Sequence, residues 1–314
     1  MFSGRPSLSW AAAKGLSLLL VSGILVSCGL YSQGRGWHTL TGPERTIIAD
    51  VPFYPQEDFQ CGPASLAMVL TWSGQLVKPA ELISEVYTPA KKGSLQSAII
   101  SAARRHGRIA YPINGAEHLM AEIAKGHPVV VLLNLGVSWY PKWHYAVVVG
   151  YDLPASEIIF HSGNIQYDRL SFRVFENIWT RSKQWGVLVL DPTHLPAVAT
   201  EEDWLEAVIG LERAAQWPAT LKAYEAALSN WPDSYAIWMG LGNSYYSLSN
   251  LPKAISAFRK AIEIQPKNGI AFNNLAHILA ETGKREESLA AAQKAVECGG
   301  PLLETFKKTL SEIQ

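Results

Sequence analysis

Residues 56–65 read QEDFQCGPAS, and this stretch decides how the middle of the chain is interpreted. Cys61 stands at the entry of a helix that we expect over residues 62–72, and Gly62 and Pro63 follow it directly. Proline suits the first turn of a helix, because the N–H that it lacks has no partner there. The positive end of the helix dipole favours a thiolate over a thiol, so the position predicts a lowered pKa for this cysteine. Taken alone, Cys61 is better explained as a small buried side chain without a chemical role.

A second stretch, WHYAVVVGY at residues 143–151, places a histidine at the start of a predicted strand. His144 follows an aromatic loop over residues 139–143. The start of a strand holds an imidazole rigidly at the edge of a groove, although a lone histidine there is more often structural. A cysteine at a helix entry and a histidine at a strand start 83 residues later together predict nucleophilic thiol chemistry.

Helices come first and strands later within residues 47–192, which predicts an α+β domain. The run PVVVLL at residues 128–133 is continuously apolar and predicts a buried strand. Further strands are expected over residues 47–53, 145–151, 157–161 and 185–190, and helices over residues 62–72, 79–87, 94–106 and 116–125. We interpret residues 193–200 as a linker to the next domain.

The last third of the chain matches itself when it is shifted by 34 residues. Within residues 235–268, the small Gly242 lets two antiparallel helices approach closely, and Pro266 ends the second helix. This spacing resembles the tetratricopeptide repeat. The resemblance implies a solenoid of three helical pairs over residues 201–302, a capping helix over residues 303–314 and a groove that binds a protein partner.

The first residues of the chain have the pattern of a secretory signal. Two charges, Arg5 and Lys14, precede an apolar run of 13 residues that ends at Ser27. A membrane-spanning helix needs about 20 such residues, so this run is too short to cross a bilayer. A charged start, a short apolar stretch and small residues at its end predict a signal peptide over residues 1–27.

The end of that signal, LVSC at residues 25–28, resembles the lipobox of bacterial lipoproteins. The resemblance implies that the chain is cut before Cys28, that this cysteine carries the lipid that holds the protein on a membrane, and that residues 28–46 form a tether. Gly29 rather than Asp follows the lipidated cysteine. By resemblance to lipoprotein sorting in the Gram-negative cell envelope, a glycine at this position favours the periplasmic face of the outer membrane over the inner membrane. The alternative is an ordinary signal with an incidental cysteine.

Residues 47–192 resemble the bacteriocin-processing, double-glycine-cleaving family of papain-like cysteine peptidases, which is family thirty-nine of clan CA. They look most like its stand-alone lipoprotein members that carry C-terminal tetratricopeptide repeats. The resemblance rests on VPFYPQ at residues 51–56, CGPASLA at residues 61–67 and HYAVVVG at residues 144–150. It implies an α+β papain-like fold ahead of the all-α repeats.

The same resemblance assigns roles to individual residues. Cys61 would be the nucleophile and His144 the general base and acid. Gln56 would donate a hydrogen bond to the oxyanion, a role for which Gln60 is the rival, and the backbone N–H of Cys61 would be the second donor.

The chain departs from the family at the third catalytic position. The family has an Asp or Asn on the strand after the histidine, but residues 159–164 read IFHSGN and hold no carboxylate. Ser162 and Asn164 are the candidates to orient His144, with His161 a further alternative. A weaker orienting group predicts slower or altered chemistry.

Composition excludes several other functions. Lys and Arg together number 27, as do Asp and Glu, so the formal net charge is zero and no basic stripe is available for nucleic acid. We expect no cofactor and no metal, because His106, His118 and His127 are scattered and lack partners at the spacing of a zinc site.

Together these features predict a membrane-anchored lipoprotein that cleaves peptide bonds through a Cys–His thiolate mechanism. Its expected partners are a peptide or protein substrate, a protein bound by the repeats, and the membrane through the N-terminal lipid. Two alternatives stay open. One is a catalytically inactive adaptor that binds peptides, and the other is an acyl or amide transferase that works through the same thioester.

Overall fold

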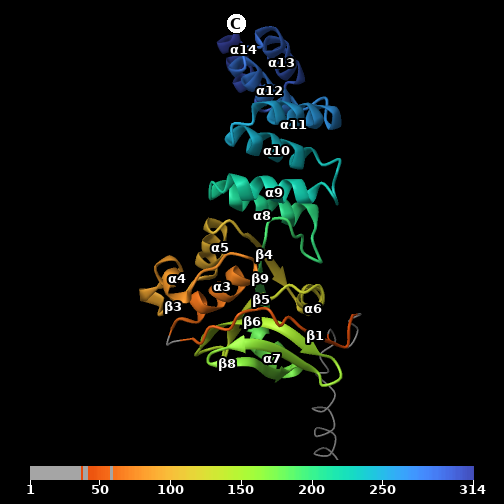
Figure 1. Ribbon diagram of the computed structural model, residues 1–314. Helices are drawn as coiled ribbons and strands as arrows, with labels where there is room; N and C mark the ends of the chain where they lie inside the picture. Colours follow the sequence, from red (N-terminus) through yellow and green to blue (C-terminus); the bar gives the residue numbers. More distant parts are fainter. Residues whose placement is uncertain (1–36, 38–41, 57–58) are drawn as a thin grey trace, which may run out of the picture. The chain divides into compact units, whose positions relative to one another are not determined.

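The computed structural model describes Trp37, residues 42–56 and residues 59–314 of the chain (Figure 1). The predicted signal peptide, the lipidation candidate Cys28 and most of the predicted tether lie outside the described residues. Thr41–Gln314 form one compact unit. Within the described part, no helix has the length and apolar character needed to span a membrane.

A seven-stranded antiparallel sheet organises the first half of this unit, in the order β4-β9-β5-β6-β7-β8, with β1 paired to β6. The strands are β1 (Arg45–Ile47), β4 (Ile109–Asn114), β5 (Val129–Asn134), β6 (Trp143–Asp152), β7 (Glu157–Ser162), β8 (Ile165–Ser171) and β9 (Trp185–Leu190). The apolar run 128–133 forms β5, in which five of the six residues are buried, as the sequence predicts.

The strand predicted over residues 47–53 is wrong. β1 covers only Arg45–Ile47, so the sheet also reaches into the segment expected as tether. Its register places Ile47 opposite Gly150, where a Cβ atom would overlap the backbone of Thr46. Ile48 still donates its N–H to the Val149 carbonyl at 2.7 Å, and beyond it the chain leaves the sheet, although Val51 stays buried.

Helices pack around this sheet and complete the domain. The predicted α+β class is confirmed. They are α3 (Cys61–Trp72), α4 (Pro79–Val86), α5 (Gln96–Arg105), α6 (Ala116–Ala124) and α7 (Phe172–Thr180). A short hairpin of β2 (Tyr87–Thr88) and β3 (Gly93–Ser94) encloses the 3₁₀ turn Pro89–Lys91. Helix α3 is buried from Gly62 to Leu70 and contacts β5, β6 and β9, so its first residue is held against the centre of the sheet.

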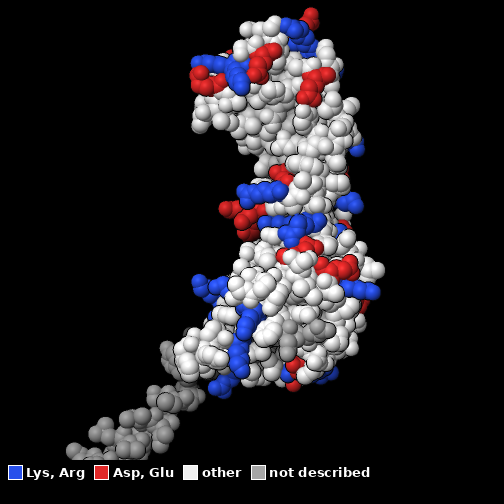
Figure 2. Space-filling model, turned by 90° about the vertical axis from the view of Figure 1, so that its left-hand side faces the viewer, with Lys and Arg blue, Asp and Glu red and all other residues white. Residues whose placement is uncertain are grey.

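The second half of the unit is entirely helical, as predicted. Its helices are α8 (Glu201–Arg213), α9 (Trp217–Ala227), α10 (Tyr235–Ser247), α11 (Leu251–Ile264), α12 (Gly269–Glu281), α13 (Arg285–Cys298) and α14 (Leu303–Ile313). A Cβ atom at Gly242 would overlap the ring of Phe258, so the small residue of the repeat does allow α10 and α11 to approach closely. Lys and Arg groups lie beside Asp and Glu groups along the repeats (Figure 2), as in the pair Arg259–Glu287 at 2.7 Å.

The segment expected as a linker, residues 193–200, is packed against the sheet domain. Lys125 donates to the carbonyl of Leu195 at 3.0 Å, and the buried Glu122 accepts from the N–H of Val198 at 3.1 Å. Helix α8 continues this contact, because it packs on β4 and α5. The first helical pair is therefore fixed to the sheet domain through several hydrogen bonds and apolar contacts.

Candidate active site

Cys61 is the first residue of α3 and is partly buried. Three backbone N–H groups, those of Cys61, Gly62 and Tyr145, stabilise a charge on its sulfur. Burial acts in the opposite direction and is the larger effect, so the pKa of the Cys61 thiol is raised. The lowered pKa expected from the helix dipole is therefore wrong for the substrate-free protein. The dipole is present, but the sulfur is too far from water for it to prevail.

The next residue explains how closely this helix start is enclosed. A Cβ atom at Gly62 would overlap the Ser94 side chain, so no larger residue fits there. Ser94 belongs to β3, and its carbonyl accepts a hydrogen bond from the Tyr145 hydroxyl at 3.2 Å. One wall of the site is thus built from β3 and β6 around the start of α3.

His144 is the second residue of β6 and pairs with Leu133 on β5. Its Nε2 atom lies 2.9 Å from the Ser162 hydroxyl. When Nε2–H donates to that oxygen, Nδ1 carries the free lone pair and can accept a proton. Burial lowers the pKa of His144, so the neutral imidazole is the favoured form.

The structure brings the start of α3, which carries Cys61, against the strand that carries His144. The sulfur contacts the backbone N–H of Tyr145, and Tyr145 directly follows His144 on β6. No hydrogen bond between the described atoms of the two side chains joins them at rest. The raised pKa of the Cys61 thiol and the lowered pKa of the His144 imidazole both favour the uncharged forms of the two groups over a thiolate–imidazolium pair.

Of the candidates for the third position, Ser162 contacts the histidine and Asn164 does not. Ser162 ends β7, whereas Asn164 is exposed in the turn that follows. His161 is fully buried elsewhere: its Nδ1 accepts from the N–H of Tyr167 at 3.2 Å, and its ring packs against Phe53. The third position is a neutral hydroxyl.

Two carboxylates that follow His144 along the chain, Asp152 and Asp191, are occupied elsewhere. Asp152 ends β6 and forms an ion pair with Arg45 at 3.0 Å. Asp191, which follows β9, pairs with Arg108 at 3.8 Å. Neither group replaces Ser162 beside the imidazole.

Gln56 lies across the site between α3, β6 and the turn after β7. Its Oε1 atom accepts from the N–H of Gly163 at 3.1 Å, which fixes the direction of the carboxamide. Its Nε2 atom lies 3.5 Å from both the Ser65 hydroxyl and the Tyr145 carbonyl, at the limit for a hydrogen bond. A donor held this weakly can turn to a stronger acceptor. Its rival Gln60 is the N-cap residue of α3, and its carbonyl accepts from Ala64 at 3.1 Å.

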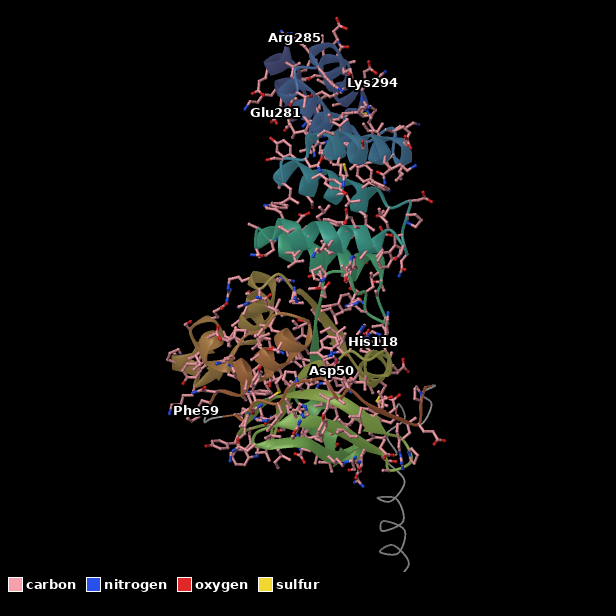
Figure 3. All side chains as sticks on the ribbon, viewed as in Figure 1. Asp50, Phe59, His118, Glu281, Arg285 and Lys294 are labelled. Carbon is pink, nitrogen blue, oxygen red and sulfur yellow. The ribbon has the colours of Figure 1, made fainter. Side chains whose placement is uncertain are left out.

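Sequence reasoning missed several residues that build this site. Ser65, Ser94 and Tyr145 contribute through a hydroxyl contact, a packed side chain and a backbone N–H, and no motif marks such roles in advance. Phe59, labelled in Figure 3, has a φ of 64° and a ring that is 56% exposed. A left-handed phenylalanine two residues before Cys61 is an uncommon conformation that costs energy.

Comparison with protein families agrees with this geometry. Residues 48–187 match the Peptidase_C39 like family, and residues 205–269 and 257–290 match tetratricopeptide-repeat models. Residues 48–187 therefore belong to the Peptidase_C39 like family, and tetratricopeptide repeats follow them. The predicted family and fold class are confirmed at this level.

Two curated relatives share part of the chain. Small glutamine-rich tetratricopeptide repeat-containing protein 2 of Mycosarcoma maydis is 31% identical over 98 residues, which are 31% of this chain and 28% of that protein. The peroxisomal targeting signal receptor of Kluyveromyces lactis is 33% identical over 60 residues, which are 19% of this chain and 11% of that protein. The chain thus spans only a minor part of the length of either relative.

Solved structures resemble each half separately. A chain described as a C39-like peptidase from Bacillus anthracis has a TM-score of 0.40 and 19% identity, and covers 47% of this chain and 98% of its own. The peptidase domain of Streptococcus ComA has a TM-score of 0.38 and 25% identity, and covers 45% and 98%. The translocator chaperone SycD of Yersinia enterocolitica has a TM-score of 0.34 and 16% identity, and covers 36% and 81%.

Proposed function

We propose that this chain, which joins a domain of the Peptidase_C39 like family to tetratricopeptide repeats, is a lipid-anchored cysteine peptidase of the bacterial cell envelope. One observation supports it above the others. The Cys61 sulfur contacts the N–H of Tyr145 beside His144, and the far nitrogen of that imidazole is held by Ser162 at 2.9 Å. This arrangement leaves Nδ1 of His144 available to the nucleophile.

The reaction starts from the neutral pair. As a peptide carbonyl approaches, the thiol proton passes to Nδ1 of His144 and the sulfur attacks the carbonyl carbon. The oxyanion accepts hydrogen bonds from Gln56 Nε2 and the backbone N–H of Cys61. His144 then gives its proton to the departing amine as the C–N bond breaks. Water, deprotonated by His144, finally hydrolyses the thioester and restores the thiol.

Ser162 limits how well this cycle runs. When Nε2 carries the proton, the hydroxyl accepts its hydrogen bond and fixes the plane of the ring, as an Asp would. It provides no negative charge, so it stabilises the imidazolium less than a carboxylate does. We therefore propose a slow peptidase.

The remaining parts of the chain recruit and locate the enzyme. The tetratricopeptide repeats support a protein partner, and we propose that they bring a peptide or protein to the peptidase domain. The sequence LVSC at residues 25–28 supports lipid attachment at Cys28, with the periplasmic face of the outer membrane as the proposed location.

A catalytically inactive adaptor is the second candidate, because Cys61 has a raised pKa and no carboxylate contacts His144. An electrophilic, peptide-like thiol probe on the full-length chain in detergent separates the two. A peptidase is labelled at Cys61, Cys61→Ala abolishes this labelling, and Cys298→Ala serves as the matched control. If Cys61 is labelled no faster than Cys298 and no member of a peptide library is cleaved, the result supports the inactive adaptor and contradicts the peptidase. Capture of the acyl group by an added amine in preference to water would instead indicate a transferase.

A further inference from the structure

The loop between β5 and β6, together with the first residue of β6, exposes large aromatic side chains to water at the end of β6 that carries His144. Trp139 is 86% exposed, Tyr140 63% and Trp143 54%. Leu135 and Val137 of the same loop are also exposed. Proteins rarely gather so many exposed apolar side chains at one place unless the patch binds something. We refer to Trp139, Tyr140 and Trp143 as the aromatic patch.

This loop is firmly built. The Asn134 side-chain oxygen accepts from the N–H groups of Gly136 and Lys142, each at 3.0 Å, and Leu135 donates to the Lys142 carbonyl at 2.9 Å. A Cβ atom at Gly136 would overlap the carbonyl of Tyr140, so the turn requires glycine. The aromatic rings are therefore presented by a rigid turn, which lowers the entropy lost on binding.

The chemistry of the proposed peptidase tells which part of a substrate meets the patch. His144 delivers its proton to the departing amine, so its ring lies on the amine side of the scissile bond. Trp143 directly precedes His144, and the rest of the patch continues from it. The patch and His144 thus lie at the same end of β6, where the substrate residues that follow the scissile bond would leave the site.

We propose that the aromatic patch binds a bulky apolar side chain, such as Leu, Phe or Trp, that follows the scissile bond, and so sets the sequence preference of the enzyme. This inference rests on the proposed peptidase function. Burial of one such side chain against the rings of Trp139 and Tyr140, which pack on each other with centroids 6.3 Å apart, favours it over Ser or Gly by about tenfold or more.

A membrane surface is a less suitable occupant. The chain enters the sheet through β1, whose Arg45 pairs with Asp152 at the far end of β6. The patch adjoins Trp143 at the opposite end of that ten-residue strand, about 30 Å away. The patch thus lies at the end of β6 that carries His144, and β1 pairs with the other end.

The test uses full-length protein in detergent and peptides that differ only in the residue after the cleaved bond. The double variant Trp139→Ala, Tyr140→Ala should lower kcat/KM about tenfold for the Phe and Leu peptides, mainly through KM, and leave the Ser peptide unchanged. Iodoacetamide labelling of Cys61 should also stay unchanged. Leu76→Ala, which removes a side chain that is 80% exposed on another loop, should behave as the wild type. Equal losses for all peptides, or no loss, overturn the proposal.

A binding measurement separates failure of the patch from failure of the peptidase. In Cys61→Ala protein, fluorescence anisotropy should show tighter binding of the Phe peptide than of the Ser peptide, and the double variant should abolish the difference. If the wild type cleaves no peptide and Cys61→Ala protein still binds the Phe peptide more tightly than the Ser peptide, the proposed peptidase function is wrong and the proposed binding by the patch is supported. If phosphatidylglycerol vesicles rather than peptide shift the tryptophan fluorescence, and Trp139→Ala removes the shift, the occupant is a lipid surface and the proposal is wrong.

Discussion

His144 Nε2 lies 2.9 Å from Ser162 Oγ, and the pairing of β6 with β7 brings together two residues that are 18 positions apart. A hydroxyl at this distance orients the imidazole but adds no charge beside it. The ring also lies in surroundings that lower its pKa, so neither neighbour nor solvent favours the imidazolium. The proposed slow chemistry follows from this one contact.

Substitutions of Ser162 should therefore lower or raise peptidase activity, depending on the side chain that is introduced. Ser162→Ala removes the hydrogen bond and should lower kcat/KM about tenfold, the effect of losing roughly 1–1.5 kcal/mol. Ser162→Asp places a carboxylate beside the ring, which stabilises the imidazolium and should raise both the pKa of His144 and the rate several-fold. The measurements are peptide cleavage against pH and NMR titration of the imidazole. Asn164→Ala, in the exposed turn two residues on, is the control and should change neither. An inactive Ser162→Asp beside a fully active Ser162→Ala would contradict this role.

Cys61 and His144 should shape the pH dependence of folding stability. Burial lowers the pKa of His144, so the stability that its neutral form supplies is present above the ordinary imidazole pKa and is lost as the pH falls through the lowered value. Burial raises the pKa of Cys61, so its contribution is present below the ordinary thiol pKa and is lost as the pH rises through the raised value.

Urea unfolding of the full chain between about pH 5 and pH 10, followed by near-UV circular dichroism, tests this dependence. His144→Gln should flatten the acid limb, and Cys61→Ser the alkaline limb. His118→Gln is the matched control, because His118 is exposed on α6 (Figure 3). An unchanged acid limb in His144→Gln would show that His144 is not buried as a neutral group.

Gly62 should tolerate no side chain. Gly62→Ala would force its methyl group into Ser94, at a cost of about 1–3 kcal/mol, and should displace the start of α3 that carries the nucleophile. Thermal unfolding and labelling of Cys61 report the two effects. Ser94→Gly removes the overlapping atoms, so the double variant Gly62→Ala, Ser94→Gly should recover the stability and the labelling that Gly62→Ala loses. Gly93→Ala is the matched control in the same hairpin, because its methyl would meet only the Lys91 carbonyl at 3.8 Å. Failure of Ser94→Gly to rescue would place the cause elsewhere.

Periodicity predicted the elements that carry a strong apolar pattern. Helix α3, strand β5 and the repeats were all predicted, because each buries a regular set of apolar residues. Strand β8 was missed, because it is an edge strand with mostly polar, exposed residues and therefore no apolar signal. Helix α7 was also missed, although Phe172, Phe175 and Trp179 are buried along one face and Ser171 caps its start. The helical spacing of its apolar residues was present in the sequence, but it extends over only nine residues.

The candidate site was predicted as residue types and not as an electrostatic state. Cys61 and His144 were singled out by their positions at a helix start and a strand start, whereas Ser162 was one of three candidates, with Asn164 and His161, that the family resemblance left open. The sign of the Cys61 pKa shift was wrong, since the helix dipole is a local property whereas burial depends on how β3 and β6 close over the sulfur. Tertiary packing of this kind has no local sequence pattern.

The contact between the sheet domain and the first helical pair should depend on Glu122. This side chain is fully buried, and its two oxygens accept from Val198 N at 3.1 Å and meet His127 Nδ1 at 2.7 Å. Glu122→Gln replaces one acceptor oxygen with an NH₂ donor and removes the charge, which weakens the hydrogen bonds to Val198 and His127 and should cost about 1–3 kcal/mol.

Release of the Val198 contact should expose residues 193–200 to proteases. Limited proteolysis with mass spectrometry is the measurement, and cleavage of Glu122→Gln within this segment should be faster than in the wild type. Glu117→Gln, an exposed position on the same helix, provides the matched control and should be cut at the wild-type rate. Equal protection in both variants would mean that the apolar packing of α8 on β4 holds the two parts together without the Glu122 hydrogen bonds.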